Sequence, residues 1–432
     1  MERLSPADAP RRPAWKWWVC GLLLLASMIN YLDRQTLANA SVRITAQFHL
    51  QQEQYGDLER AFGWAFATGS LLFGIAADRV SVRWLYPLVL VLWSAVGFAT
   101  GRVESHEGLL LCRTLLGLFE GGHWPCAIKT TQALLAPTDR PLGNSVLQSG
   151  TSLGAIIAPL IMQAMLTSEL SSWRLPFQVV GAAGLLWVAA WFLLVRKGDL
   201  AVTAATASAP GPDPEGSRAG ERDPGILALL ATPRLWVLFF VVACINTCWQ
   251  LIRAWLPKFL QEGRGYPEAQ ALYFNSFFYV ATDLGCLGAG ALALWLVRRR
   301  WSVDRARLAV FLGCSLLAAL TVLAVTLPRG WPLLLLLLLV GAGALGVFPI
   351  YHAFTQEISR HHQGKVTGIT GVAAWILSAP AQSLFGRLID RTGSFNAGFA
   401  VAGLLPVLAS LALLCFWRSS ASATLGRSPG RT

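Results

Sequence analysis

The sequence contains few charged residues for its length. Asp, Glu, Lys and Arg make up 13% of the 432 residues, whereas about 25% is usual in a soluble domain. Apolar residues make up 54%. A chain this poor in charge cannot cover a soluble fold with polar side chains, so we expect an integral membrane protein with many spans in the lipid bilayer.

Motifs that would indicate other protein classes are also missing. The sequence has no nucleotide-binding loop, no HExxH metal helix and no stretch that predicts a large extramembrane domain. Histidines at membrane depth are few, and the eight cysteines lie in or at the ends of apolar segments, where they are expected to pack as small residues. We therefore expect neither an enzyme nor a receptor, and no cofactor, metal site or disulfide framework.

The basic excess, a net charge of +12, does not indicate a nucleic-acid partner. Basic residues have no patch interleaved with aromatic residues and lie mostly between apolar runs, where the preference of cytoplasmic loops for Lys and Arg accounts for them. The first apolar run follows basic residues but has no small-residue cleavage site at its end. It is therefore expected to be a first membrane helix and not a removable signal peptide.

Twelve apolar segments predict an all-α membrane protein with twelve transmembrane helices. The segments are residues 15–40, 56–77, 84–101, 108–133, 143–166, 175–196, 233–258, 269–297, 306–327, 331–356, 364–386 and 397–417. A stretch rich in Ala, Pro, Gly, Ser and charge separates the sixth from the seventh and is expected to be a linker. The predicted organisation is a tail (1–14), a six-helix bundle (15–197), a linker (198–232), a second six-helix bundle (233–418) and a tail (419–432).

The distribution of basic residues predicts the orientation of these helices. If both termini are cytoplasmic, the inside segments contain roughly three times as many Lys and Arg residues as the outside ones, as the positive-inside rule requires. We therefore expect a multi-pass protein of the plasma membrane, which is the inner membrane in a bacterium, with both termini in the cytoplasm. A monomer is expected.

The two halves share a pattern of small residues. Gly143, Gly150, Ala158 and Pro159 of the fifth segment recur at a constant offset as Gly364, Gly371, Ala379 and Pro380 of the eleventh. Arg34 and Arg253 also stand at nearly the same offset in the first and seventh segments. Two pseudo-symmetric halves with polar groups at related depths are typical of a transporter that moves around a midplane site.

Charged residues in the first and fourth segments are the main candidates for that site. Asn30, Asp33 and Arg34 stand at i, i+3 and i+4 and are predicted to share one helix face. Burying such charges costs about 3 kcal/mol each on insertion scales, so they usually face a protein interior or a water-filled path. The alternative is a pair, Asp33 with Arg34, that only neutralises both groups.

In the fourth segment Arg113, Gly117, Glu120 and Trp124 follow helical spacing and predict one stripe. A buried Glu that an Arg can hold ionised suits a proton-coupled carrier, whereas the alternative is a static tether between Arg113 and Glu120. His123 is expected to be a packing histidine, and Pro125 a kink.

The loop after the second segment contains GIAADRVSVRW. It resembles the cytoplasmic loop signature of the major facilitator superfamily, although Ser81 stands where that signature usually has Gly. The resemblance implies a conformational latch at helix ends across the two halves, formed here by Gly74, Asp78, Arg79 and Arg83. The alternative is an ordinary positive-inside loop with an incidental acid.

Further stretches narrow the resemblance. INYLDRQTL, the RxxxxxxEGGxWP of Arg113 to Pro125, SGTSLGAIIAP, WLPKFLQEGRG, TDLGCLGAG and WSVDRAR together resemble the anion:cation symporter branch, which includes bacterial hexuronate and galactonate transporters. The resemblance implies the major facilitator fold and proton-coupled symport of a small organic anion such as a hexuronate, with exchange or uniport as the alternative. It also implies that Asp33, Arg34, Arg113 and Glu120 serve anion binding and proton coupling.

The predicted site extends into both halves. Arg34 is expected to hold the substrate carboxylate. Arg253 departs from the family pattern and either binds a second anionic group or extends to the outer surface. Trp249 either stacks on a sugar ring or packs, and the polar face of the tenth segment departs from the hexuronate pattern. The predicted substrate-binding residues are Asn30, Tyr31, Arg34, Trp249, Gln250, Arg253, Tyr351 and Gln356, and the predicted proton-coupling residues are Asp33, Arg113 and Glu120.

Overall fold

The computed structural model describes residues 14–136, 139–196, 198–200, 232–358 and 363–417, of which residues 141, 356–358 and 363–369 are described in their backbone alone. The chain divides into two compact units. Unit 1 comprises Met1–Asp223 with Glu268–Ser276, and unit 2 comprises Pro224–Pro267 with Phe277–Thr432. The predicted tails and the predicted linker lie outside the described residues, except for a few residues at their edges.

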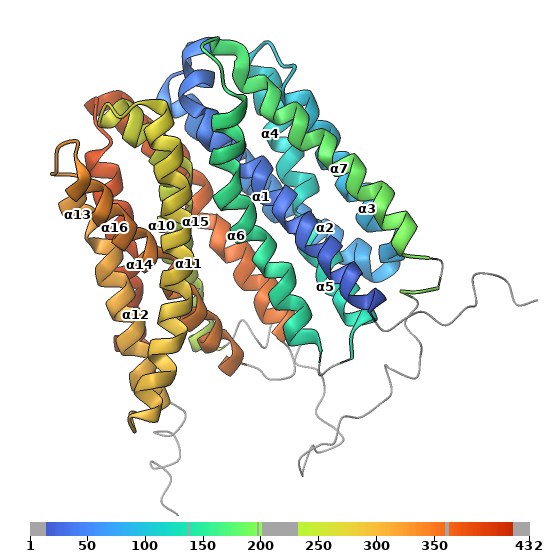
Figure 1. Ribbon diagram of the computed structural model, residues 1–432. Coiled ribbons are helices and arrows are strands. Elements are labelled where there is room, and N and C mark those ends of the chain that lie inside the picture. The colour runs from blue at the N-terminus through green and yellow to red at the C-terminus, as the bar shows by residue number, and fades with distance from the viewer. Residues whose placement is uncertain (1–13, 137–138, 197, 201–231, 359–362, 418–432) are drawn as a thin grey trace, which may run out of the picture. The chain divides into compact units, whose positions relative to one another are not determined.

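Unit 1 is built from helices joined by short loops (Figure 1). Its helices are α1 (Trp15–Phe48), α2 (Gln52–Arg79), α3 (Val82–Thr100), α4 (His106–Glu120), α5 (His123–Leu134), α6 (Arg140–Met165), the 3₁₀ turn η1 (Leu170–Trp173) and α7 (Arg174–Leu194). Ser105 caps α4, because its hydroxyl accepts a hydrogen bond from the amide of Gly108 at 3.1 Å.

Unit 2 has the same all-helical character in its described part. Its helices are α10 (Pro233–Lys258), the π-helical turn η2 (Phe259–Gly263), α11 (Glu268–Arg298), α12 (Val303–Ala319), α13 (Thr321–Ala324), α14 (Trp331–Ile358), α15 (Gln363–Thr392) and α16 (Asn396–Phe416). The first residues of α11 belong to unit 1 by their contacts. Apart from residues at their ends and the breaks at Gly121–Gly122 and Leu320, the predicted apolar segments fall on helices, which confirms the all-α prediction.

Ten helical stretches of the described chain are long and apolar enough to cross a membrane. They lie on α2, α3, α6, α7, α10, α11, α12, α14, α15 and α16. Helix α1 is 34 residues long but carries a polar stretch from Asn30 to Asn39 and is not among them. The fourth predicted segment is not among them either, because it is interrupted.

That interruption corrects the prediction of one continuous helix over 108–133. Helix α4 ends at Glu120, α5 begins at His123, and Gly121 and Gly122 stand between them. Neither piece alone, at 15 and 12 residues, has the roughly 20 residues that a span needs. The predicted stripe is therefore divided, because Glu120 is on α4 and Trp124 is on α5.

Glycines bring α2 and α4 into backbone contact. A Cβ atom on Gly69 would stand against the carbonyl oxygen of Leu118, one on Gly117 would stand against that of Phe62, and one on Gly121 would lie 2.6 Å from that of Phe66. Only residues without a side chain permit this approach. The close packing fixes the depth of Glu120 relative to α2.

Corresponding helices pack alike in the two units. In unit 1, α1 packs extensively on α6 and α3 packs on α7; in unit 2, α10 packs on α15 and α12 packs on α16. Pro159 and Pro380, which the sequence repeat relates, lie inside α6 and α15. Gly150 meets the backbone of α1 at Leu24, whereas the related Gly371 faces open space. The two units therefore share the same pairing of helices, but the related glycines do not all make the same contacts.

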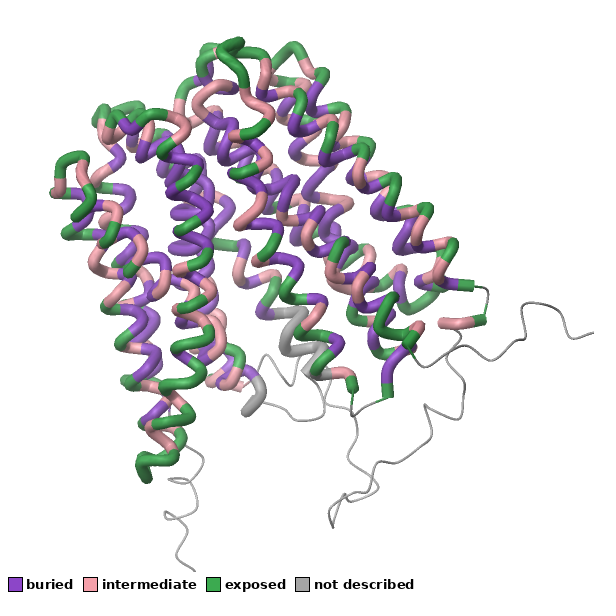
Figure 2. Tube along the Cα trace, viewed as in Figure 1, coloured by how far each residue is buried: buried purple, intermediate pink, exposed green. Residues whose placement is uncertain are grey.

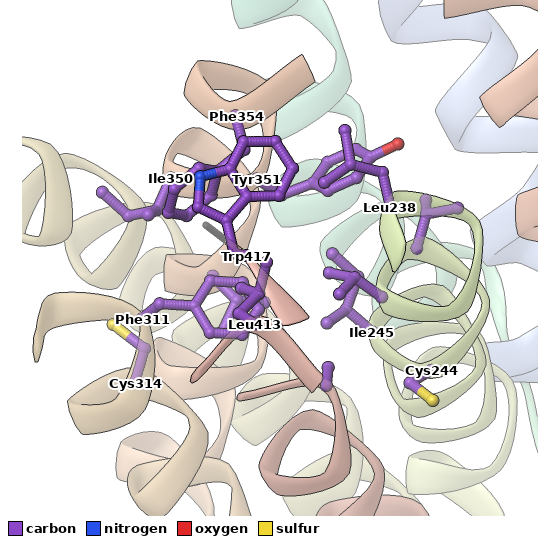
Figure 3. Close-up of a cluster of buried hydrophobic side chains, with 14 of the residues drawn as sticks. Leu238, Cys244, Ile245, Phe311, Cys314, Ile350, Tyr351, Phe354, Leu413 and Trp417 are labelled. Atoms are coloured by element: carbon purple, nitrogen blue, oxygen red, sulfur yellow. The ribbon is translucent and has the colours of Figure 1, made fainter. Parts of the chain in front are cut away.

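Helices α1 and α10 are the buried helices of their units, and buried residues follow most of their length (Figure 2). In unit 2, side chains of α10, α12, α14 and α16 form a hydrophobic cluster (Figure 3). It includes Leu238, Ile245, Phe311, Phe354 and Trp417, which are nearly or fully buried. The functional candidates of the first and seventh segments thus stand on the most enclosed helices.

The glycine contacts make a prediction about stability. Gly69→Ala should destabilise the protein by about 1–3 kcal/mol, because the methyl group has no room against Leu118. The matched control is Gly21→Ala on α1, where a Cβ would meet nothing within 4 Å, and this change should be neutral or stabilise by up to about 1 kcal/mol. Thermal unfolding in detergent measures both, and equal melting temperatures would contradict the packing role.

Candidate functional site

A buried ion pair joins α1 to α4. Nε of Arg34 donates to Oε2 of Glu120 at 2.8 Å, and both side chains are almost entirely enclosed. Nη2 of Arg34 has no hydrogen-bond partner among the described residues. Arg34 thus has a carboxylate partner and also an unused donor in a buried position, which is the arrangement that lets a guanidinium receive a second anionic group.

A second buried pair joins α4 to α2. Nη2 of Arg113 lies 3.2 Å from Oε1 of Glu59, and the exposed fractions of these two side chains are 0% and 1%. Helical spacing predicts Arg113 and Glu120 on one helix face, but it does not identify Glu59 as the partner of Arg113. The sequence feature that could have identified Glu59 is its position, since it is an acid one helical turn inside the second apolar segment, in DLERAFG. Arg34 and Arg113 therefore each make an ion pair across a helix interface.

Asp33 does not point the same way as Arg34. Its carboxylate lies against Gly97 of α3, since a Cβ on Gly97 would stand 3.0 Å from Oδ1 of Asp33. Both Asp33 oxygens are buried and have no hydrogen-bond partner among the described residues. Asp33 interacts electrostatically with Glu120, Arg113 and Arg34.

Asp33 and Arg34 therefore contact different helices, α3 and α4, because adjacent residues stand about 100° apart on a helix, although both interact with Glu120. The neutralising pair of Asp33 with Arg34 is not formed as a hydrogen-bonded contact. Asn30 is buried, and its amide has no partner in the described chain. The first helix thus has four buried polar side chains with unused hydrogen-bonding capacity, Asn30, Asp33, Arg34 and Gln35.

Aromatic rings surround the Arg34 guanidinium. Its central carbon lies 4.5 Å from the ring centroid of Phe66, 5.2 Å from that of Phe62 and 5.4 Å from that of Tyr31. The guanidinium of Arg113 lies 4.5 Å from the Phe62 centroid. These distances are within the range of cation–π attraction. Tyr31 therefore contacts the predicted binding residue.

His123 connects three helices at the start of α5. Its Nε2 is 3.0 Å from the hydroxyl of Ser27 on α1, and its Nδ1 is 3.0 Å from the hydroxyl of Tyr86 on α3. The ring is fully buried and has edge contacts with Trp93 and Trp124. His123 is a packing residue, as predicted, and both of its ring nitrogens are hydrogen-bonded.

In unit 2 the predicted residues of α10 are buried. Arg253 is 3% exposed, and its Nε donates to Oε1 of Gln250 at 2.7 Å. Of the two alternatives for Arg253, extension to the surface is excluded in this structure. Trp249 packs edge-on against Tyr279, with centroids 6.1 Å apart, while Asn246 bonds to Ser378 of α15 at 2.9 Å.

The candidates of the tenth segment lie on α14. Tyr351 is buried in the hydrophobic cluster of unit 2, among residues such as Ile350 and Leu238 (Figure 3). Its ring therefore packs in the core of that unit. Gln356 is on the same helix, but its side chain lies outside the described residues.

The latch residues stand at the junction of α2 and α3. Oδ1 of Asp78 lies 3.1 Å from Nζ of Lys129 on α5, which also donates to the carbonyl of Ala77. The Asp78 side chain is 83% exposed. Lys129 was counted in the sequence only as a basic residue of the inside surface. The described contact of Asp78 thus joins two helices of unit 1.

The neighbouring residues complete this region. Arg83 donates from Nε to the carbonyl of Val195 at 3.1 Å and lies over the ring of Trp84. Arg79 lines a pocket of about 380 Å³ together with Asp78 and Lys129. A Cβ on Gly74 would meet nothing within 4 Å. Asp78, Arg79, Arg83 and Lys129 therefore form a polar cluster at these helix ends.

Comparison with known proteins agrees with this architecture. The chain is 28% identical to the hexuronate transporter of Bacillus subtilis (strain 168) over 410 residues, covering 92% of this chain and 93% of that protein. It is 22% identical over 407 residues to the hexuronate transporter of Escherichia coli (strain K12), with the same coverage.

Solved structures share the fold. A bacterial homologue of the human lysosomal transporter Spinster, in an inward-facing and occupied conformation, superposes with a TM-score of 0.74 at 17% identity, over 97% of this chain and all of that one. A D-xylose–proton symporter superposes with a TM-score of 0.73 at 16% identity, over 93% and 97% of the two chains. The family model described as "Major Facilitator Superfamily" matches residues 23–379, and with its paired helical units and buried charges this chain belongs to the major facilitator superfamily.

Proposed function

We propose that this protein transports a sugar acid, such as a hexuronate, across the membrane together with protons by alternating access. The observation that carries the proposal is the buried pair of Arg34 and Glu120, in which the cation retains an unused donor. Relatives that match along nearly the whole chain are named hexuronate transporters. A buried guanidinium with a replaceable carboxylate partner is suited to an anionic substrate.

The coupling follows from competition for the cation. A substrate carboxylate that binds Arg34 weakens its attraction for Glu120, so protonation of Glu120 becomes more favourable. By linkage, protonation of Glu120 favours substrate binding to the same degree. Asp33, which is buried and interacts electrostatically with both members of the pair, is the second proposed proton carrier. Protons are the coupling ion, and no cofactor takes part.

The remaining candidates complete the proposal. Arg113 holds Glu59 and sets the local charge, and Arg253 with Gln250 and Trp249 binds a further polar group of the substrate. Asn30, Tyr31 and Gln356 are proposed to line the substrate path, and Tyr351, whose ring packs in the core of unit 2, is proposed to reach it with its hydroxyl alone. The protein acts as a monomer in the plasma membrane, with both termini in the cytoplasm.

Uptake by reconstituted vesicles tests the proposal directly. Labelled galacturonate, supplied with and without an inward proton gradient, should accumulate only with the gradient. Uptake that requires substrate on the other side would indicate an exchanger, and uptake that never exceeds equilibrium would indicate a uniporter. A panel of hexuronates, aldonates and dicarboxylic sugar acids would then establish the substrate range.

Arg34→Lys should raise the apparent KM for galacturonate at least about tenfold. Lysine keeps the charge but loses the planar fork that pairs with two carboxylate oxygens, and a charged hydrogen bond contributes about 1.5–3 kcal/mol. Arg60→Lys on the exposed part of α2, where Arg60 pairs with Asp57, is the matched control and should leave KM unchanged. An unchanged KM in Arg34→Lys would refute direct binding by Arg34.

Glu120→Gln should keep substrate exchange but lose accumulation driven by a pH gradient. Glutamine resembles the protonated acid, so the site can bind substrate without carrying a proton. A gradient of one pH unit is worth about 1.4 kcal/mol, which can drive tenfold accumulation of substrate for each proton transported. In Glu120→Gln the ratio of substrate inside to substrate outside should fall toward one. Asp33→Asn should behave in the same way unless Asp33 only orients Arg34, in which case binding is lost too. Full proton-driven accumulation in both variants would leave these acids as structural counter-ions.

Asp78→Asn should shift the balance of conformations without changing the order of substrate preference. The change removes the ion pair with Lys129 at the end of α2, far in sequence from the binding candidates, and it biases states through helix-end contacts. Distances between spin labels report the populations, and competition by sugar acids reports the preference. Asp57→Asn, which breaks the other exposed ion pair of α2, is the control. An altered substrate order in Asp78→Asn would contradict the latch role.

A further inference from the structure

The Arg34 guanidinium has two kinds of neighbour, one charged and one uncharged. It forms an ion pair with Glu120, in which Nε donates to Oε2 at 2.8 Å. Its uncharged neighbours are rings, of which Phe66 at 4.5 Å and Phe62 at 5.2 Å are supplied by α2. The two phenylalanines are one helical turn apart and are stacked, with centroids 5.9 Å apart and planes inclined by 24°.

Proton coupling creates a difficulty that these rings can resolve. When Glu120 accepts a proton, Arg34 loses its hydrogen-bonded ion-pair partner, although it must stay in position for the substrate. Asp33, the other acid that interacts electrostatically with Arg34, makes no hydrogen bond to it and is itself a proposed proton carrier. A buried cation without its partner is strongly disfavoured and tends to move toward water or another anion. A second carboxylate could hold it but would compete with the substrate. An aromatic face attracts the cation without neutralising it.

We propose that Phe62 and Phe66 are positioning residues that hold the Arg34 guanidinium in place while Glu120 is protonated, and so keep its N–H groups available to the substrate carboxylate. The proposal rests on the proposed function, because it assigns a step in the same coupling cycle. The central carbon of the guanidinium lies over the ring faces, whereas carboxylates bind a guanidinium through its N–H groups. The two interactions therefore do not exclude one another.

Phe66 is the residue to test, because Phe62 also lies 4.5 Å from Arg113 and would disturb both ion pairs. Phe66→Leu keeps an apolar side chain but removes the aromatic face. Phe66→Tyr keeps the face and should preserve function. Phe73→Leu is the matched control on the same helix, since Phe73 contacts the ring of Phe119 at 6.5 Å and has no described cation contact.

The first experiment measures galacturonate exchange in vesicles. Phe66→Leu should raise KM about threefold to thirtyfold with little change in the maximal rate, as expected from the strength of one buried cation–π contact. The same substitution in the Glu120→Gln variant should raise KM further than it does in the wild type, because the rings are then the main hold on Arg34. Phe66→Tyr, which keeps the aromatic face, should have a KM within about twofold of the wild-type value. Equal effects of Phe66→Leu in both backgrounds, or of Phe66→Leu and Phe73→Leu, would overturn the proposal.

The second experiment needs no substrate and separates this proposal from the proposed function. Thermal unfolding of the purified protein in detergent should show that Phe66→Leu lowers the melting temperature more in the Glu120→Gln background than in the wild type. Phe73→Leu should lower it equally in both. A positive result with no sugar-acid transport would retain the ring contact and reject the substrate assignment, whereas additive effects of Phe66→Leu and Glu120→Gln would reject the positioning role itself.

Discussion

The cost of placing charged groups inside an apolar helical bundle shapes unit 1. Arg34, Arg113, Glu59 and Glu120 are buried, and each would be strongly destabilising without a partner. The structure compensates this cost by pairing each cation with a carboxylate from another helix, so that α1, α2 and α4 are joined through charges. The pairs constrain how these helices pack.

Glycine packing and the interruption of the fourth span both help to bring the buried charges of unit 1 together. Gly69, Gly117 and Gly121 let the backbones of α2 and α4 meet, which brings Phe62, Phe66 and Glu59 of α2 close to the guanidinium groups. The interruption at Gly121–Gly122 places Glu120 at the last residue of α4 and His123 at the first of α5. His123 then secures the start of α5 to α1 and α3 through its two ring nitrogens.

An ion pair that contributes to stability can also serve transport if one member can exchange partners. Arg34 can do so because its ion pair uses Nε, while Nη2 has no hydrogen-bond partner in the described chain. Arg113 and Glu59 are more enclosed, with both side chains at 1% exposure or less, which suits a fixed element of the site. The proposed division of roles between the two arginines thus rests on exposure, which is 8% for the Arg34 side chain and 0% for that of Arg113.

The sequence by itself determined the all-helical membrane fold, its paired halves and most of the charged residues of the site. Apolar run length and helical periodicity are local properties, and a charge in an apolar run is visible without knowledge of the fold. Only the tertiary structure decided which charge meets which. Adjacent residues on one helix face different neighbours, so Asp33 meets α3 while Arg34 meets α4. Glu59 acquired its role, and Phe62 and Phe66 their contact with Arg34, because glycines on both α2 and α4 allow these helices to approach. That approach is a property of packing and not of any single segment.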